Sequence, residues 1–382
     1  MSKPKIAYIT VEDPNDKHAW SGTNYYILQS LRKHVGDVEA LGPFKAGFTG
    51  FICKVINFTS IFVMGKRFDY RHSLIFAKTC SAFFQERLSG KKYDLIVAPA
   101  GISCIAYLKT QIPIVYIGDR VIEGAMNYHE ILSGLWDFSK EQSIGTDKIA
   151  LQNARLNIFS SQWAADFALN DYGISREKLA VIPFGANMDD IPAKEVALKE
   201  KNNGACNLLL IGTSWKNKGA DIAYNALLEL LRKGIDAQLT VCGCVPPNDL
   251  KHEKLTVIPF LNKNTEEGKK KLEQLFINST FFILPTRFDC TPIVFCEASA
   301  YGLPVISADT GGVEGHIKEG INGYLINYND TGKAYADKIA EIYNDKQQYN
   351  KLRESARNLY EEQLNWDAWA EKFKSAIKNI IS

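Results

Sequence analysis

Short apolar runs without polar alternation recur along the whole chain, and they are the feature that most constrains its fold. Runs rich in Val, Ile and Leu occupy residues 5–10, 94–99, 113–117, 156–160 and 179–183 in the first half, and 206–212, 238–242, 255–258, 281–284, 304–307 and 323–326 in the second. Strands that are apolar on both sides are typical of a parallel sheet covered by helices on both faces. Each run is therefore predicted to be a strand of such a sheet.

Between these runs, apolar residues recur with helical spacing, as in 24–35, 161–172, 219–233 and 267–278. A strand–helix alternation that is repeated twice predicts an α/β fold with two doubly wound domains. The length of 382 residues suits two domains with separate cores. The polar stretch 185–204 is predicted to link them, so the domains are expected at 1–185 and 186–362.

The composition argues against several classes of protein. The net charge is only +2, with 45 basic and 43 acidic residues, so no nucleic-acid partner is expected. The first residues lack the apolar core of a secretory signal, and no transmembrane helix is expected. The eight cysteines lie mostly in apolar runs without zinc-site spacing, so free, buried thiols are expected in a reducing cytoplasm.

One apolar stretch allows two interpretations. Residues 48–64 read FTGFICKVINFTSIFVM and are followed by GKRFDYR. A membrane-surface helix with a basic flank has this composition, and the protein would then contact a membrane peripherally through 48–67. A core helix of the first domain has it as well. The core helix is favoured here, because the basic residues are few and do not form a face.

The segment RFDCTPIVFCEASAYGLPVISADTGG, residues 287–312, contains the first candidate site. It begins in the exit loop of a predicted strand. Thr291 is expected to cap a helix that begins at Pro292 and ends before Gly302. The free N–H groups at the N-terminus of a helix attract anions, so this loop is a candidate phosphate site.

Two carboxylates and a glycine pair flank this predicted helix. Asp289 precedes the cap, and Glu297 lies about one and a half turns into the helix, so both could face a ligand with hydroxyl groups. A carboxylate in an apolar run is costly to bury unless such a partner satisfies it. Gly311 and Gly312 follow the next predicted strand and allow a ligand to approach the backbone closely.

The loop after the first strand of the second domain adds a cation. In LLLIGTSWKNKGAD, Gly212 ends the predicted strand, and Lys218 is expected in the first turn of the following helix. A lysine opposes the dipole of a helix N-terminus unless an anion lies between them, which favours a phosphate ligand. The loop fits neither the Walker nor the dinucleotide-binding glycine pattern. Phosphate-binding groups beside carboxylates that suit sugar hydroxyls together describe a nucleotide-sugar site.

These motifs resemble those of the retaining GT-B glycosyltransferases of family four, also called group 1. The pattern is an acid, seven residues, Glu297 and then GLPVISADTGG, with GTSWKNKG upstream. WSGTNYYILQSL is similar to the family's glycine loop and first helix, and SSQWAADFALNDYGISREKLAVIPFGAN to its run into the linker. The resemblance covers nearly the whole chain. It implies a GT-B fold of two doubly wound Rossmann-like domains facing a central cleft, with a C-terminal helix at 363–382 that joins the first, acceptor-side domain.

The resemblance also implies a role for each site residue. Lys218 would bind the diphosphate, Asp289 would lie near the transferred sugar, and Asp119 stands where many relatives have a sugar-contacting histidine; these three would be the catalytic residues. Glu297 would bind the ribose hydroxyls, and Gly22 would bring backbone amides to the donor. The other donor-binding residues would be Cys290, Thr291, Pro292, Ile293, Thr213, Gly311 and Gly312.

Three positions depart from the family pattern. The first acid is Asp289 where relatives have Glu, Thr213 stands where they have Arg, and Ser21 stands where they have another glycine. These differences affect the identity of the donor and its phosphate binding more than the class of reaction. A nucleotide-sugar epimerase on the same fold and a non-catalytic nucleotide-sugar-binding protein are the alternatives.

The implied function is transfer of a hexose from a UDP- or GDP-sugar to a glycan, lipid or small-molecule acceptor, in bacterial-type polysaccharide or glycoconjugate biosynthesis. No cofactor is expected, because the nucleotide-sugar is a substrate. The chain contains no D-x-D pair that would hold Mg²⁺ or Mn²⁺, so no metal is expected. The expected location is the cytoplasm, with the inner face of the membrane as the alternative. His18, His129 and His316 have no partner spacing and are expected to be structural or surface residues.

Overall fold

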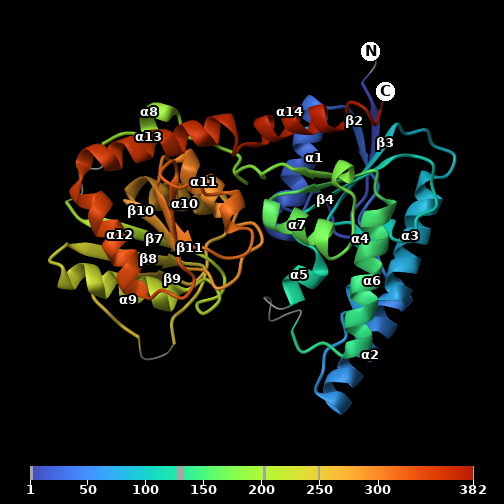
Figure 1. Cartoon of the computed structure of the whole chain (residues 1–382), viewed down its shortest axis with the longest axis horizontal. Helices are drawn as coiled ribbons and strands as arrows, with labels where there is room; N and C mark the ends of the chain where they lie inside the picture. The colour runs from blue at the N-terminus through green and yellow to red at the C-terminus, as the bar shows by residue number, and fades with distance from the viewer. Residues whose placement is uncertain (1–2, 127–132, 201–203, 248–249, 382) are drawn as a thin grey trace. The chain divides into compact units, whose positions relative to one another are not determined.

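The chain forms two units, each around its own parallel sheet (Figure 1). The computed structural model describes residues 3–126, 133–200, 204–247 and 250–381, so His129 lies outside the described residues. The first unit comprises Met1–Pro183 with Trp369–Ser382, and the second comprises Phe184–Ala368.

A six-stranded parallel sheet forms the centre of the first unit. Its strands are β1 (Lys5–Tyr8), β2 (Asp37–Ala40), β3 (Leu95–Pro99), β4 (Ile114–Gly118), β5 (Leu156–Phe159) and β6 (Leu179–Val181), in the order β2-β1-β3-β4-β5-β6. Every residue of β3, β4 and β5 is buried, as expected when helices cover both faces. The strand order changes direction between β1 and β3, which makes this pair the topological switch point.

Helices connect these strands and cover the sheet. They are α1 (Thr23–His34), α2 (Gly47–Met64), α3 (Leu74–Leu88), α4 (Ile102–Ile105), α5 (Ile122–Met126), α6 (Asp137–Asn153) and α7 (Gln162–Asn170), with short 3-10 turns η1 (Ala19–Gly22), η2 (Tyr70–His72) and η3 (Arg176–Lys178). The C-terminal helix α14 (Trp366–Ile377) joins this unit from Trp369 onward. Its side chains Trp369, Phe373 and Ile377 are buried, which fixes the helix by its apolar face.

The second unit repeats the architecture with another strand order. Its strands are β7 (Cys206–Ile211), β8 (Ala237–Cys242), β9 (Leu255–Ile258), β10 (Phe281–Leu284), β11 (Val305–Ala308) and β12 (Gly323–Ile326), all parallel and in the order β12-β11-β10-β7-β8-β9. This is the strand order of the dinucleotide-binding Rossmann fold. The switch point lies between β7 and β10, so their exit loops are where a ligand is expected to bind.

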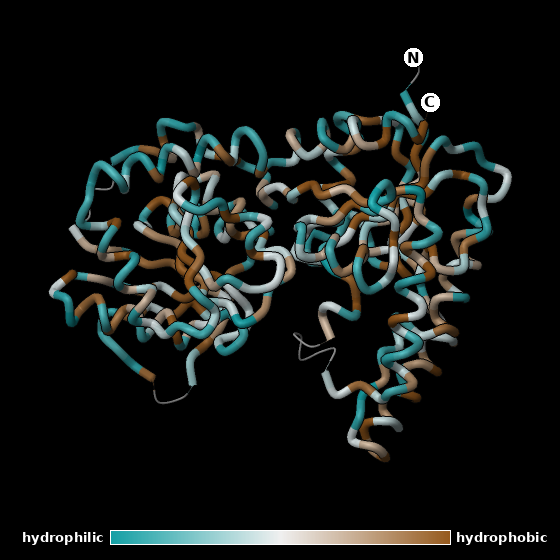
Figure 2. Tube along the Cα trace, in the orientation of Figure 1, coloured by the Kyte–Doolittle hydropathy of each residue, from teal (hydrophilic) through white to brown (hydrophobic). Residues whose placement is uncertain are grey.

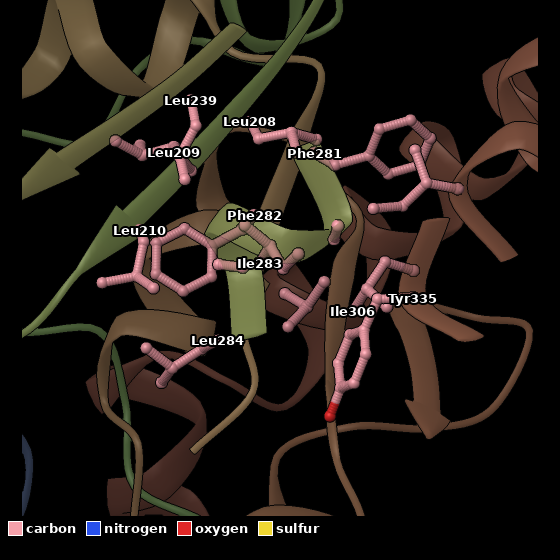
Figure 3. Close-up of a cluster of buried hydrophobic side chains, with 14 of the residues drawn as sticks. Leu208, Leu209, Leu210, Leu239, Phe281, Phe282, Ile283, Leu284, Ile306 and Tyr335 are labelled. Atoms are coloured by element: carbon pink, nitrogen blue, oxygen red, sulfur yellow. The ribbon is translucent and has the colours of Figure 1, made fainter. Parts of the chain in front are cut away.

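Apolar side chains from both sides of this sheet form the second core. The helices of the unit are α8 (Lys194–Ala197), α9 (Ala220–Arg232), α10 (Glu266–Asn278), α11 (Val294–Ala300), α12 (Gly332–Asn344) and α13 (Lys346–Glu362), with the 3-10 turn η4 (Val313–Gly315). Figure 3 shows Leu210 of β7, Phe282 of β10 and Tyr335 of α12 among the packed side chains. Figure 2 shows the same distribution along the chain, with apolar strands inside and more polar helices around them.

The predicted strands are confirmed with end shifts of one or two residues, and one strand was missed. β2 has the sequence Asp-Val-Glu-Ala and pairs only with β1 at the edge of the sheet. Because an edge strand is not covered on both sides, it tolerates acidic residues that hide the apolar pattern. The eight cysteines are free and buried, as predicted.

Helix α2 contradicts the prediction of a core helix. It is 18 residues long with a mean hydropathy of 1.5, yet only 17% of it is buried. By length and composition alone it could cross a membrane, although no transmembrane helix was expected from the sequence.

Candidate functional site

The exit loops of β7 and β10 are held against each other in the second unit. After β7, a compact turn places Lys218 N 3.0 Å from Ser214 O and leads to Gly219, which has φ +70°. A Cβ at Gly219 would lie 1.9 Å from Pro285 O in the loop after β10, so only glycine allows this approach. Lys218 lies in this turn, before α9 begins at Ala220, so its predicted place in the first helical turn is wrong.

Hydrogen bonds fasten the two loops further. Asn217 O accepts from Arg287 N at 2.8 Å and from Thr286 Oγ1 at 3.1 Å. The Arg287 guanidinium binds both carboxylate oxygens of Asp221 on α9, at 2.8 and 2.7 Å. Such a bidentate pair adds geometric specificity to its charge. The loops therefore form a fixed surface at the switch point of the sheet.

Lys218 and Asp289 meet on this surface. The Lys218 Nζ lies 2.5 Å from Asp289 Oδ2, and Asp289 Oδ1 accepts from Thr291 N at 3.2 Å. Lys218 was predicted to face a phosphate, but the anion beside it in the structure is the Asp289 carboxylate. An ammonium group has three N–H donors, so Lys218 can bind a second anion while it keeps Asp289.

The glycine pair after β11 packs on the Asp289 backbone. Gly311 has φ +55°, and a Cβ there would lie 2.4 Å from Asp289 O. Gly312 N donates to the same oxygen at 3.0 Å. Since β7, β10 and β11 are neighbours, the structure brings together Lys218, Asp289 and the glycine pair. The pair thus determines where Asp289 lies.

The helix after β10 begins later than predicted. Thr291 does not cap it: its hydroxyl donates to Cys290 O at 2.8 Å, and its N–H is taken by Asp289. The backbone therefore stays in a turn until α11 starts at Val294, so Thr291 as N-cap and Pro292 as first helical residue are both wrong. The predicted end is confirmed, because Gly302 has φ +55° and Leu303 N donates to Ala298 O at 2.9 Å.

Glu297 is a buried carboxylate in the first turn of α11, not one and a half turns inside it. Its Oε1 lies 3.9 Å from Lys263 Nζ, which is an ion-pair contact but too long for a hydrogen bond. Burial raises the pKa of Glu297, and the Lys263 charge only partly opposes this effect. A buried acid with a perturbed pKa at a strand exit is a candidate ligand-binding group.

His316, which was expected to be a structural or surface residue, is buried. It is 1% exposed, and neither ring nitrogen makes a hydrogen bond of good geometry with the described residues. Burial lowers the pKa of His316 to about 4, against the opposing influence of Asp289 and of the Gly312 backbone. His316 therefore lies beneath the surface that carries Asp289.

The other predicted donor residues lie around the same loops. Thr213 is exposed directly after Gly212, Cys290 and Pro292 are buried, and Ile293 is half-buried just before α11. They gather at the exits of β7 and β10, as their sequence positions imply.

In the first unit, the predicted residues lie at the exits of β1 and β4. Gly22 has φ +91° and directly precedes α1, and Asp119 directly follows β4. Asp119 Oδ2 accepts from the indole N–H of Trp20 at 3.0 Å, so these two exits are linked. The backbone at Trp20 and Ser21 adopts the left-handed conformation, with φ +47° and +57°. Backbone strain of this kind often marks a functional loop, and sequence reasoning missed Trp20.

A cavity of about 350 Å³ lies in the first unit between the exit of β1 and the start of α2. Apolar side chains, including those of Val11, Phe44 and Phe51, form much of its lining, and Lys54 and Arg71 add positive charge. Arg71 also binds Glu12 at 2.9 Å. The cavity could hold a ligand that is partly apolar and partly anionic.

The second unit matches a known family. Residues 205–345 match the model described as glycosyl transferases group 1. The match contains Lys218, Asp289, Glu297 and the glycine pair, and it leaves the first unit outside.

Curated relatives align with part of the chain. It is 27% identical over 188 residues to spore coat protein SA of Bacillus subtilis, covering 45% of this chain and 48% of that protein. It is 22% identical over 252 residues to a D-inositol 3-phosphate glycosyltransferase of Paenarthrobacter aurescens, covering 62% and 61%. The alignments thus span less than two thirds of either relative's length.

Solved structures match the whole fold. Sucrose-phosphate synthase of Thermosynechococcus elongatus superposes with a TM-score of 0.67 at 15% identity, covering 99% of both chains. Anabaena Alr3699/HepE, solved with UDP and glucose, gives 0.64 at 16% identity, covering 98% of this chain and all of that one. Residues 205–345 of the second unit therefore resemble group 1 glycosyltransferases, and the chain has the GT-B fold, with two Rossmann-like domains.

Proposed function

We propose that the protein is a retaining hexosyltransferase that uses a nucleoside-diphosphate sugar. The observation that carries this proposal is the meeting of Lys218, Asp289 and the Gly311–Gly312 pair at the switch point of the second sheet, with Glu297 in the first turn of α11, the helix that follows the Asp289 loop. A cation there suits a diphosphate, and an acceptor-only carboxylate suits ribose hydroxyls. The family match over these residues supports the assignment.

In the proposed reaction, the bond between the anomeric carbon and the diphosphate oxygen breaks. The acceptor oxygen bonds to the anomeric carbon on the face that the diphosphate leaves, and its proton passes to a phosphate oxygen of the leaving group. Negative charge builds on the diphosphate, so the Lys218 ammonium stabilises the transition state more than the ground state. Asp289 holds Lys218 in position, and Glu297 fixes the nucleoside.

The donor is proposed to be a UDP- or GDP-sugar. Alr3699/HepE was solved with UDP and with UDP-glucose, which makes UDP-glucose the first donor to test. Thermal shifts with a panel of nucleotide-sugars would rank donors, because ligands that bind the folded state raise Tm. Glu297→Gln should weaken donor binding about tenfold or more, as expected for a hydrogen bond to a charged group. Unchanged binding would remove Glu297 from the donor site. Glu195→Gln, on exposed α8, is the control.

We assign the acceptor to the first unit and propose the cavity beside Arg71 as its place. A glycan, lipid or small molecule with an anionic group would suit its lining. A relative encoded in the cps region of Klebsiella pneumoniae supports a role in polysaccharide or glycoconjugate synthesis, for which the cytoplasm is our proposed location. Arg71→Ala should raise the KM for the acceptor and leave the rate of donor hydrolysis unchanged. Equal losses in both would contradict this assignment.

The proposed reaction needs no divalent metal. The sequence has no D-x-D pair, and the described residues contain no group of three His, Cys, Asp or Glu side chains placed to hold an ion. Full transfer activity in excess EDTA is the expected result; activity that returns only with added Mg²⁺ or Mn²⁺ would overturn it.

An epimerase is the second candidate, because a structure described as a putative UDP-N-acetylglucosamine 2-epimerase of Listeria monocytogenes superposes with a TM-score of 0.57. The same donor incubated without any acceptor separates the two. An epimerase changes the sugar on the nucleotide, whereas a transferase at most releases the diphosphate slowly. A protein that only binds nucleotide-sugars would do neither.

A further inference from the structure

Helix α2 packs on the first unit with small and polar side chains and exposes large apolar ones, which is the reverse of an ordinary surface helix. The side that packs on the first unit carries small or polar residues, of which Gly50, Cys53 and Ser60 are buried. Asn57 lies on this side as well and accepts a hydrogen bond from Phe68 N at 2.9 Å, while Ser60 donates to Lys66 O at 2.7 Å. The buried contacts of the helix are therefore made by small side chains and hydrogen bonds, whereas its large apolar residues are at most half-buried, as Ile52 and Ile56 are.

The large apolar residues of α2 face solvent. Phe48, Phe51, Val55, Phe58 and Phe62 are all exposed and follow one another at intervals of three or four residues, so they form one continuous face. Phe58 is 72% and Phe62 83% exposed, and Ile61, Val63 and Met64 are exposed on other sides of the last turns of the helix. Figure 1 shows α2 reaching beyond the rest of the first unit at this end. An apolar patch of this kind marks a site of interaction.

The charge around α2 indicates what covers the face. Between Glu39 and Asp69 the chain has no acidic residue, whereas it has Lys45, Lys54, Lys66 and Arg67. Lys54 lies on the helix itself and is exposed, as are Lys45 and Arg67. Lys66 contacts Asp137 at 3.4 Å, so part of its charge is neutralised. An apolar helix face with basic residues and no acids complements an anionic lipid surface.

We propose that α2 docks the protein onto an anionic lipid bilayer, lying in the plane of the interface with its phenylalanine face among the acyl chains. A spanning orientation would require the helix to leave its packing against α3 and η2 and to bury Asn57 and Lys54 in hydrocarbon. In the docked orientation these contacts are kept, and Lys54 reaches the headgroups. The docking goes beyond the proposed transfer activity and does not depend on it.

Flotation with vesicles tests the proposal on the full chain. The wild-type protein should float with phosphatidylglycerol–phosphatidylcholine vesicles at a 3:7 ratio and much less with pure phosphatidylcholine. The double variant Phe58→Asp/Phe62→Asp should lose at least nine-tenths of the bound fraction. Phe260→Asp is the matched control, because Phe260 is 73% exposed in the second unit and should not affect binding. A wild-type protein that stays in solution, or a double variant that binds as well as wild type, would overturn the proposal.

A second measurement separates a membrane from a second copy of the chain. Both substituted phenylalanines are exposed, so the double variant should keep the wild-type Tm. Sedimentation velocity without lipid should give the same monomer mass for wild type and variant. If the wild type is a dimer that Phe58→Asp/Phe62→Asp dissociates, the face is a protein interface and the proposal fails. Lys54→Glu should weaken binding to the anionic vesicles several-fold without changing the mass.

Discussion

The loops at the strand exits are built in different ways in the two units. In the second unit, glycines occupy the positions of closest approach, as Gly219 does against Pro285 and Gly311 against Asp289, and ion pairs fasten the loops together. In the first unit, the described loops after β1 and β3 contain the non-glycine residues with positive φ, which are Trp20, Ser21 and Ala100. The loops of the second unit are thus unstrained and held together by ion pairs, whereas those of the first unit contain strained backbone.

The difference shows what each kind of loop achieves. Glycine lets two backbones meet without strain, so the surface around Asp289 can be rigid and ready for a charged ligand. A non-glycine residue in the left-handed region costs about 1 kcal/mol or more and persists only when other contacts compensate. One contact that can compensate is the hydrogen bond from the Trp20 side chain to Asp119, which a glycine at position 20 could not make.

The largest expected effect comes from Lys218→Ala in the second unit, where ion pairs hold the strand-exit loops together. If Lys218 stabilises charge on a leaving diphosphate, its removal should lower kcat/KM by about 10²–10³, the range seen when one preorganised donor is removed. It also leaves Asp289 without its ion-pair partner. Lys270→Ala, on the exposed side of α10, should keep full activity in the same assay. A Lys218→Ala enzyme with wild-type kcat/KM would mean that the pair only fastens the loops.

The next largest effect is a loss of stability from a substitution that disrupts the close approach of Gly219 to Pro285. Gly219→Ala should destabilise the second unit by about 3 kcal/mol or more. The added methyl would lie 1.9 Å from Pro285 O, and the backbone at position 219 has a positive φ that alanine disfavours. Gly234→Ala is the matched control: its φ is +77°, but nothing lies within 4 Å of the added carbon. That variant should lose only about 1 kcal/mol. Urea unfolding followed by circular dichroism measures both, and equal losses would show that φ alone accounts for the effect.

The units also differ in how buried ionisable groups respond to acid. Burial lowers the pKa of His316 to about 4, so between pH 6.5 and 4 the unfolded chain binds more protons and the second unit loses stability as the pH falls. Burial raises the pKa of Asp147 on α6 to about 6, so this group stabilises the first unit at low pH and loses that contribution as the pH rises through 6. Acidification should therefore weaken the second unit relative to the first.

His316→Leu tests the larger of these effects. At pH 5 the shift of the His316 pKa corresponds to a loss of about 2 kcal/mol, which the variant would not show. The stability difference between wild type and variant should thus change by about this amount from pH 7.5 to pH 5, as measured by urea unfolding at each pH. The value at pH 7.5, where His316 is neutral in both states, serves as the internal reference. A difference that does not vary with pH would contradict a buried neutral histidine.

The sequence predicted the strands well, because a strand buried on both faces needs an unbroken apolar run, as in β3 and β10. It missed β2, where Asp37 and Glu39 are tolerated at the sheet edge. It left α2 open between two interpretations, since composition does not show which face of a helix packs. Only the burial of Gly50, Cys53 and Ser60 shows that the phenylalanines point outward.

Within the candidate site, the sequence predicted which residues gather but not which atoms meet. Gly311 and Gly312 suggested a close approach, and the structure shows that the approaching group is the Asp289 backbone. Thr291 has the side chain of a helix cap, but its hydroxyl donates to Cys290 O, and α11 begins only at Val294. The charge of Asp289 influences the pKa of His316 from 27 positions away in the sequence, a separation over which no local pattern acts. The sequence could not show which hydrogen-bond partner a side chain chooses, nor which residues distant in sequence come close together.

The smallest expected effect is that of Ser21→Gly, which tests whether backbone strain in the first unit serves a function. Ser21→Gly removes the side chain at φ +57° and should stabilise the protein by up to about 1 kcal/mol, provided that relief of strain exceeds the added entropy of the unfolded chain. Ala334→Gly, inside α12, removes a side chain where φ is helical and should instead cost about 1 kcal/mol. If transfer activity falls while the stability of Ser21→Gly rises, the strained loop is kept because it positions Gly22 and Trp20 for binding. If both stay at wild-type values, the left-handed conformation at Ser21 carries no measurable cost, and the contrast between the two units would then lie only in their glycine contacts and ion pairs.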